Sequence, residues 1–287
     1  MGLIQDRVVV VTGASRGAGK GIAVALGATG ATVYVTGRSR REGDAPLPGT
    51  VQATAEAVTA AGGRGIAVYC DHADDAQVAQ LFDQVRREYG RLDILVNNAT
   101  VLHDALTDTG PFWGKPLALA DILDVGLRSH YTSTWFAAPL LLANGEGLVV
   151  NTSSFGGRIY MHGPAYGAGK AGIDKMAHDM AVDFRPHRVA VVALWMGLLA
   201  TERTRRVFAA EPEKYAGMAQ TAESPEFPGR VIDALARDPD LMDRSGKVWI
   251  GAELGEAYAI TDIDGRQPLS PRAFFGDTTH FGEAIVE

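Results

Sequence analysis

The sequence predicts an α/β fold in which a single Rossmann-like domain contains one doubly wound parallel sheet with helices on both faces. Short runs of β-branched apolar residues alternate along the chain with longer segments of helical periodicity. These runs are apolar at consecutive positions, which is typical of strands that are buried on both faces of a parallel sheet. A glycine-rich turn follows the first run. Because crossovers between parallel strands are right-handed, the alternation favours helices on both sides of the sheet.

Seven apolar runs are predicted as strands and six periodic segments as helices. The strands are residues 7–12 (RVVVVT), 31–36 (ATVYVT), 65–70 (GIAVYC), 92–97 (LDILVN), 148–152 (LVVNT), 188–194 (RVAVVAL) and 247–250 (KVWI). The helices are residues 17–27, 50–61, 74–89, 117–143, 164–183 and 231–237. In the third helix, for example, Val78, Leu81 and Val85 recur at the spacing of one helix face.

Three segments interrupt this pattern, namely residues 40–49, 100–116 and 200–228, and all three contain prolines and glycines. Long loops at the carboxyl edge of a parallel sheet are where ligands bind. We therefore expect residues 200–228 to form a lid over a substrate. The chain shows no clear pattern after Gly251. Residues 1–255 are predicted to form the domain and residues 256–287 a C-terminal extension.

The composition narrows the class of protein. A net charge of −7 argues against a surface for nucleic acid or for an anionic membrane. The one cysteine, Cys70, cannot form an internal disulfide, which fits a reducing cytoplasm. We recognise no signal-peptide pattern and no apolar run near the roughly 18 residues that span a bilayer. The histidines show no metal-ligand spacing. The expectation is a cytoplasmic protein with no metal site.

The segment TGASRGAG at residues 12–19 is predicted to bind a pyrophosphate. Glycines permit a tight turn there and let backbone amides approach phosphate oxygens closely, and the start of the following helix adds unpaired N–H groups and a favourable dipole. A glycine-rich turn alone is weak evidence, but this one lies between the first strand and the first helix of an alternating pattern. The residues predicted to contact a dinucleotide here are Gly13, Ser15, Arg16, Gly17, Ala18 and Gly19.

The end of the second strand favours NADP(H) over NAD(H) as the dinucleotide. A carboxylate that would read a ribose 2′-hydroxyl is expected about 20 residues past the glycines. Gly37 stands there instead, followed by Arg38, and Arg16 lies within the glycine-rich turn. Guanidinium groups suit phosphate geometry, so these arginines are predicted to bind a 2′-phosphate. The alternative is that the arginines form a solvated surface loop.

Tyr166 and Lys170 are four residues apart and therefore share one face of a predicted helix. A tyrosine has a pKa of about 10 and is a poor acid–base catalyst at neutrality. A neighbouring ammonium favours the phenolate and is expected to lower the pKa of Tyr166. The spacing by itself is only moderately specific, since two surface residues of an amphipathic helix can show it.

In combination, these motifs resemble the short-chain dehydrogenase/reductase family along nearly the whole predicted domain. The matching pieces, in the family's order, are TGASRGAG (12–19), CD (70–71), NNA (97–99), NTSS (151–154), YGAGK (166–170) and MGLLAT (196–201). The chain most resembles the branch of dehydrogenase/reductase member 1, through GATGATVYVTGR (27–38), FWGKP (112–116), VGLRSHY (125–131) and DIDGR (262–266). Members of that branch are known as NADPH-dependent carbonyl reductases with broad or poorly defined substrates.

The resemblance implies roles for individual residues. Tyr166 would be the general acid/base, and Lys170 would bind the nicotinamide ribose and lower the pKa of Tyr166. A serine would hydrogen-bond the substrate carbonyl oxygen, where negative charge develops. Counting along the strand from Asn151 favours Ser154, whereas counting back from Tyr166 equally allows Ser153. We choose Ser154 because the strand is rigid. The further cofactor contacts implied are Asp71 and His72 at the adenine, Asn97 and Ala99 along the cofactor, and Leu199 and Thr201 at the nicotinamide carboxamide and the phosphates.

The function implied is reversible hydride transfer between NADP(H) and the carbon of a carbonyl or secondary alcohol, with a carbonyl reductase as the expected activity. The alternative is a nucleotide-binding sensor or scaffold that has lost turnover. Members of the family commonly pair through the long helix and the helix of the tyrosine and lysine. The resemblance therefore implies a homodimer or homotetramer, with a small carbonyl or alcohol compound as substrate and no nucleic acid or membrane as partner.

Gly126 departs from the family's pattern, because an asparagine usually stands there and completes a proton relay to the lysine. This departure is the only support for the sensor alternative. Ser129 and His130 lie three and four residues further on, so either side chain can face the same way on a helix. We hypothesise that His130 takes over this role. The alternative is a packing histidine.

Overall fold

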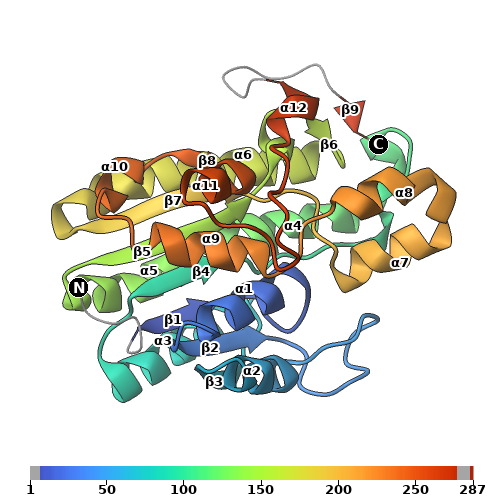
Figure 1. Cartoon of the computed structure of the whole chain (residues 1–287). Coiled ribbons are helices and arrows are strands. Elements are labelled where there is room, and N and C mark those ends of the chain that lie inside the picture. Colours follow the sequence, from blue (N-terminus) through green and yellow to red (C-terminus); the bar gives the residue numbers. More distant parts are fainter. Residues whose placement is uncertain (1–6, 277–284, 287) are drawn as a thin grey trace.

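The computed structural model describes residues 7–276 and 285–286, and a seven-stranded parallel sheet lies at its centre (Figure 1). The strand order is β3-β2-β1-β4-β5-β7-β8, and every neighbouring pair is parallel. The strands are β1 (Val8–Val11), β2 (Thr32–Gly37), β3 (Arg64–Tyr69), β4 (Ile94–Asn97), β5 (Gly147–Ser153), β7 (Val189–Trp195) and β8 (Val248–Ile250). The predicted fold class is therefore confirmed.

The helices cover both faces of this sheet. Against one face pack α1 (Gly17–Gly27), α2 (Val51–Ala60), α9 (Phe227–Leu235) and α11 (Gly251–Ala257). Against the other pack α3 (Asp75–Tyr89), α5 (Ser129–Asn144) and α6 (Pro164–Phe184). The sequence sets several of these boundaries. Asp74, for example, accepts hydrogen bonds from the first amides of α3, and Gly90 ends that helix in a left-handed conformation with φ 69°.

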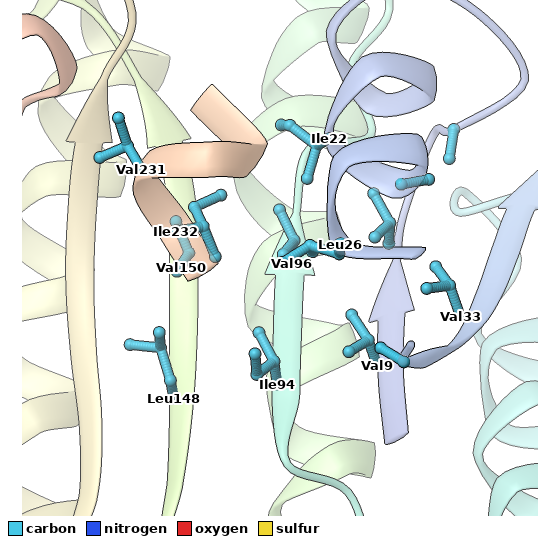
Figure 2. Close-up of a cluster of buried hydrophobic side chains, with 14 of the residues drawn as sticks. Val9, Ile22, Leu26, Val33, Ile94, Val96, Leu148, Val150, Val231 and Ile232 are labelled. Atoms are coloured by element: carbon cyan, nitrogen blue, oxygen red, sulfur yellow. The ribbon is translucent and has the colours of Figure 1, made fainter. Parts of the chain in front are cut away.

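Alternate residues of each strand supply the two cores. Val9 and Val11 of β1 point to the face of α1, whereas Val8 and Val10 point to the face of α3. Figure 2 shows the first core, where Val9 and Val96 lie below and beside Leu26 of α1, and Leu148 and Val150 lie below α9. Burial on both faces explains why the strand sequences carry no polar alternation.

The segment from 117 to 143 was predicted as one long helix, and this prediction is wrong. The structure divides it into a 3-10 turn (Leu117–Ala120), α4 (Asp121–Leu123), a π-type turn (Asp124–Arg128) and α5. Val125 and Gly126 have non-helical dihedrals, and Gly126 has φ 150°. The Ser129 hydroxyl accepts a hydrogen bond from the Gly126 amide at 3.1 Å and so satisfies a donor freed by the break.

Residues 200–228 contain two helices rather than an irregular loop. They are α7 (Glu202–Ala210) and α8 (Pro212–Thr221), which lie together at the right of Figure 1. Backbone hydrogen bonds join the segment before α7 to the segment after α8. The Ala200 amide donates to the Glu223 carbonyl, and the Glu223 amide donates to the Leu198 carbonyl, both at 2.8 Å.

The segments that follow α9 also have more structure than the sequence suggests. They contain α10 (Leu241–Arg244), α11, α12 (Arg272–Phe275) and β9 (Ile285–Val286), and β9 pairs in parallel with β6 (Tyr160–Met161). Arg266 donates to the carbonyls of Gln220 and Ala222, so this part of the chain holds the end of α8.

Cys70 lies directly after β3 in the second core and is inaccessible to solvent. Burial and the nearby acidic residues raise the pKa of its thiol to about 12. None of the helices among the described residues is both long and apolar enough to span a membrane.

Candidate functional site

The predicted site residues lie at the carboxyl edge of the sheet, and the glycine-rich turn and the serines lie where β1, β4 and β5 end. The glycine-rich turn follows β1, Asn97 ends β4, and Ser153 ends β5. These three strands are neighbours in the sheet. The edge of a parallel sheet between such loops is where α/β proteins bind ligands.

The glycine-rich turn requires glycine at two positions. Gly13 has φ 64°, and a Cβ added there would lie 2.6 Å from the Cα of Ala99. A Cβ added at Gly19 would lie 2.4 Å from the Gly13 carbonyl oxygen. Real side chains do not make such contacts with backbone atoms. The turn is therefore packed tightly against the end of β4, with the start of α1 behind it.

Thr12 and Asn98 hold this turn in place. The Thr12 hydroxyl accepts hydrogen bonds from the amides of Asn98 at 2.8 Å and Ala99 at 2.9 Å. The Asn98 side chain donates to the carbonyls of Thr12 at 3.0 Å and Gly13 at 3.1 Å. Sequence reasoning singled out neither residue for this role, although both stand within the NNA and TGASRGAG motifs.

The Asn97 side chain lies in the interior below the site and does not face the solvent. It is fully buried and donates to Thr134 Oγ1 and to Asn151 Oδ1, each at 2.9 Å. These bonds join β4 to α5 and β5. A role of the Asn97 side chain in fixing these elements fits this geometry better than direct contact with a ligand.

Two of the predicted arginines lie near one another at the end of β2. The Arg16 guanidinium donates to the carbonyls of Pro48 and Gly49 and to the Ser39 hydroxyl. Burial is the main cause that lowers the pKa of Arg16, and the charge of Arg38 adds to it. The Arg38 side chain is 61% exposed and lies 3.9 Å from Asp71. Arg38 is thus exposed beside Asp71, whereas Arg16 is held by the loop of residues 40–49.

His72 is enclosed rather than exposed at a binding surface. Its Nε2 lies 2.8 Å from the Thr36 hydroxyl. Burial lowers the pKa of His72 to about 4, so the imidazole is neutral at physiological pH. A direct contact of the His72 side chain with a ligand therefore has little geometric support. Asp71, in contrast, is partly exposed beside Arg38.

Ser154 and Tyr166 lie in direct contact. Their hydroxyl oxygens are 2.9 Å apart. Ser153 points elsewhere, because its hydroxyl donates to the Lys170 carbonyl at 3.4 Å within the interior. Of the two serines left open by the sequence, only Ser154 lies beside the Tyr166 hydroxyl. The turn Phe155–Gly157 follows Ser154, and its compactness brings the hydroxyl onto α6.

The pKa of Tyr166 is raised above its usual value, although a lowered pKa was expected from the sequence. Desolvation of the phenol raises the pKa, and the hydrogen bond with Ser154 opposes this only in part. The Lys170 ammonium lies 5.7 Å from the centre of the Tyr166 ring and donates to the Thr152 carbonyl at 3.1 Å. Burial lowers the pKa of Lys170 to about 8, and Asp174 acts against this effect. In the structure, Tyr166 is therefore a neutral phenol.

A carboxylate from the lid lies at the predicted phosphate site. The Gly17 amide donates to Glu202 Oε2 at 2.9 Å. Gly17 is the first residue of α1, and Glu202 is the first residue of α7. The amide at the start of α1 therefore points at an anionic group, as predicted for a pyrophosphate. Sequence reasoning did not find Glu202.

The other lid residues named from the sequence lie beside this contact. Thr201 caps α7, and its hydroxyl accepts a hydrogen bond from the Thr204 amide at 3.2 Å. Its methyl group lies 3.7 Å from the Cβ position of Gly17. Leu199 is buried and pairs with Glu223. Thr201 is thus near the turn, whereas Leu199 anchors the base of the lid.

His130 does not share the cavity that Gly126 lines. Gly126 lines a small cavity together with Tyr166 and Lys170, and His130 is absent from that lining. His130 is buried, and its burial and the Lys170 charge lower its pKa to about 3. An enclosed, neutral imidazole fits the packing alternative better than a role in moving protons.

A second hollow lies at His162, a neighbour of Tyr166. Its lining residues are Leu106, Thr107, Asp108, Gly110, Lys115, Tyr160 and His162. The His162 ring meets the Tyr166 ring edge-on with centroids 5.0 Å apart. Phe112 and Trp113 pack on one another but remain exposed outside this lining. No cluster of metal-ligating side chains occurs within the described residues.

The arrangement joins an anion-binding turn to a phenol that is able to donate a proton. The hydroxyls of Ser154 and Tyr166 converge at one point, where a substrate oxygen can accept hydrogen bonds from both. The Lys170 ammonium lies behind the phenol. This geometry suits chemistry in which an oxygen gains negative charge and a proton.

Comparison with known proteins gave matches over most of the chain. A family model described as short chain dehydrogenase matches residues 7–212. Dehydrogenase/reductase SDR family member 1 of Mus musculus is 43% identical over 274 residues, covering 92% of this chain and 85% of that protein. The 3-oxoacyl-(acyl-carrier-protein) reductase of Synechocystis sp. is 32% identical over 254 residues, covering 87% and 96%. The crystal structure of a proposed dehydrogenase from Xanthomonas campestris superposes with a TM-score of 0.75 at 25% identity, covering 98% and 97%.

Proposed function

Since the chain belongs to the short-chain dehydrogenase/reductase family, we propose that it is an NADP(H)-dependent carbonyl reductase. It would transfer a hydride between the nicotinamide and the carbon of a carbonyl or secondary alcohol. The observation that carries this proposal is the convergence of the Ser154 and Tyr166 hydroxyls, 2.9 Å apart, beside Lys170. The curated relative from Synechocystis is named as a reductase, which favours the direction of reduction.

The described residues fit a dinucleotide at the glycine-rich turn. Gly13 and Gly19 leave no room for side chains, and the Gly17 amide already holds a carboxylate. The residues that would hold the cofactor are Gly13, Ser15, Arg16, Gly17, Ala18, Gly19, Arg38, Asp71, Ala99 and Thr201, with Lys170 at the nicotinamide ribose. The bound nicotinamide supplies the hydride. The protein residues orient the substrate and handle the proton.

Tyr166 would hold that proton at its phenolic oxygen. Because desolvation raises its pKa, the phenol is protonated at neutral pH and suits the role of general acid in reduction. The Ser154 hydroxyl would donate to the same carbonyl oxygen and stabilise the negative charge that develops on it. The Lys170 ammonium would favour the phenolate after the proton has left.

The preference for NADP(H) rests on charge at the end of β2. Gly37 occupies the position where a carboxylate would repel a 2′-phosphate, and Arg38 follows it with an exposed guanidinium. The rigidly held Arg16 lies nearby.

The direct experiment is to measure the oxidation of NADPH by absorbance with a panel of ketones and aldehydes, with NADH for comparison. Absence of any turnover with either cofactor across the panel contradicts the proposal.

The substitution Arg38→Ala is expected to raise the KM for NADPH about 10- to 100-fold and to leave the KM for NADH within about twofold. A charge-assisted hydrogen bond to the 2′-phosphate is worth about 1.5–3 kcal/mol, and NADH has no such phosphate. Steady-state kinetics with both cofactors measure this. Arg41→Ala removes an exposed arginine three residues away and serves as the control. Equal losses with NADPH and NADH would contradict the assignment.

The substitution Glu202→Gln is expected to strengthen NADPH binding about two- to fivefold. A carboxylate at the start of α1 is favoured by about 0.3–1 kcal/mol, and it competes with a pyrophosphate for the same amide. Binding is measured by titration of NADPH fluorescence. Glu213→Gln changes the charge of an exposed residue in α8 and should leave the affinity unchanged. Weaker binding by the Glu202→Gln protein would show that the carboxylate supports the cofactor instead.

We also propose that the protein is a homo-oligomer that pairs through α5 and α6, and that it works in the cytoplasm. Tyr131, Trp135 and Leu142 of α5 and Val182 of α6 are apolar side chains left exposed on these helices, with Trp135 62% exposed. Surface patches of this kind mark interfaces.

The proposal of a cytoplasmic location rests on the single buried cysteine, which fits a reducing compartment. The substrate would be a small carbonyl or alcohol compound.

A further inference from the structure

We propose that Asp174 is a positioning residue for the active site, a buried carboxylate that keeps the Lys170 ammonium charged and fixes the turn that carries Ser154. Its consequence for catalysis depends on the proposed function. Asp174 lies one helical turn after Lys170 on α6, so the two side chains share a face of the helix. Asp174 lies outside the YGAGK motif that contains Tyr166 and Lys170.

The carboxylate of Asp174 is enclosed and held in one orientation. The side chain is 4% exposed, and the Trp195 indole nitrogen donates to its Oδ1 at 2.9 Å. Its Oδ2 is buried, and no hydrogen bond of standard geometry reaches it in the described part of the chain, although the Ser153 hydroxyl helps to stabilise the charge. Trp195 ends β7 and is itself buried. A buried carboxylate with few hydrogen bonds lowers the stability of the fold unless a nearby positive charge compensates for it.

Lys170 supplies the opposite charge. Its ammonium is buried and donates to the Thr152 carbonyl, a neutral acceptor. Burial lowers the pKa of Lys170 to about 8, and the Asp174 charge raises it. Burial raises the pKa of Asp174 to about 6. The hydrogen bond from Trp195 acts in the opposite direction, and Ser153, Arg158 and Lys170 also favour the charged carboxylate. Both groups are therefore charged near pH 7, and Asp174 is the charge that raises the pKa of Lys170.

Asp174 also supports the turn that follows Ser154. A Cβ added at Gly157 would lie 3.0 Å from Asp174 Oδ2, so this turn rests directly on the carboxylate. Phe155 in the same turn packs against the Trp195 ring with centroids 4.5 Å apart. Asp174 thus connects α6, β7 and the Ser154 turn behind the hydroxyls of the site.

The substitution Asp174→Asn tests the charge separately from the packing. The asparagine amide oxygen can still accept the Trp195 hydrogen bond, whereas the negative charge is lost. We expect the pKa of Lys170 to fall by about one unit, because the substitution removes the neighbouring negative charge that raises it, and a neighbouring opposite charge commonly shifts a pKa by that amount. The ammonium would then be lost at lower pH, and the alkaline limb of kcat/KM for carbonyl reduction would move to lower pH by the same amount.

Two measurements decide the proposal. The pKa of Lys170 is followed by NMR of protein labelled with ¹³C at the lysine Cε, without cofactor or substrate, and the pH profile of kcat/KM is recorded with NADPH. Asp179→Asn is the matched control, because Asp179 lies on the same helix but is exposed and pairs with Lys175. It removes an equal charge and should shift neither quantity.

An unchanged Lys170 pKa in the folded Asp174→Asn protein would overturn the proposal, and so would an equal shift in the Asp179→Asn protein. A uniform loss of activity without a shifted pH limb would likewise overturn it, since it indicates a structural role alone. The NMR measurement does not need turnover. If no carbonyl compound is reduced by the native protein, the proposed function fails while the Lys170 pKa still decides the role of Asp174.

Discussion

Replacement of Tyr166 by phenylalanine is expected to lower kcat for carbonyl reduction by about 10²- to 10⁴-fold, the usual contribution of a positioned general acid. The ring and its packing against His162 would be retained, and only the hydroxyl 2.9 Å from Ser154 would be lost. The KM for NADPH should change little, since the glycine-rich turn and the arginines are untouched. Steady-state kinetics on a substrate found in the panel measure both constants.

The matched control for this prediction is Tyr131→Phe, which removes a phenolic hydroxyl from an exposed position on α5. It should leave kcat unchanged. A Tyr166→Phe protein that turns over a genuine substrate at the native rate would refute the assignment of Tyr166 as the general acid. It would also remove the main support for the proposed mechanism.

Replacement of Gly13 by alanine is expected to lower the free energy of unfolding by about 3 kcal/mol and to weaken NADPH binding. A left-handed residue with a side chain costs about 1–2 kcal/mol, and overpacking adds about 1–3 kcal/mol. The new Cβ would lie 2.6 Å from the Ala99 Cα, a backbone atom that cannot move without displacing the end of β4. Urea denaturation and NADPH fluorescence titration measure the two effects.

Gly90→Ala is the control for this substitution. Gly90 has φ 69°, close to the φ of 64° at Gly13, but a Cβ there would meet nothing within 4 Å. Its loss of stability should therefore be the conformational cost alone, about 1–2 kcal/mol. Equal losses at the two positions would mean that the contact with Ala99 relaxes freely.

The sequence contains most of the information for the sheet. Strands buried on both faces are apolar throughout, and this property is visible without coordinates. The break near Gly126 was not predictable in the same way, because apolar spacing continues across it. The break depends on tertiary contacts, such as the hydrogen bond from the Val101 amide to the Val125 carbonyl. The helices of the lid were also missed, since their prolines and glycines suggested a loop.

The candidate site was predictable where chemistry and spacing coincide. Tyr166 and Lys170 stand one helical turn apart in the sequence, so their common face follows directly. Asp174 is also one turn from Lys170, but its importance arises from burial against Trp195, which lies on another element. The pKa of Tyr166 was wrongly expected to fall, because spacing reveals a neighbouring charge but not the desolvation that outweighs it.

The enclosure of Cys70 has a practical consequence for studying motion in this protein. Its thiol remains protonated up to high pH and is out of reach of solvent, so maleimide reagents should leave it unmodified. A cysteine introduced at the exposed Met218 of α8 would then be the sole target for a fluorophore. The chain is in this respect already suited to site-specific spectroscopy of α7 and α8, with no prior removal of its native sulfhydryl.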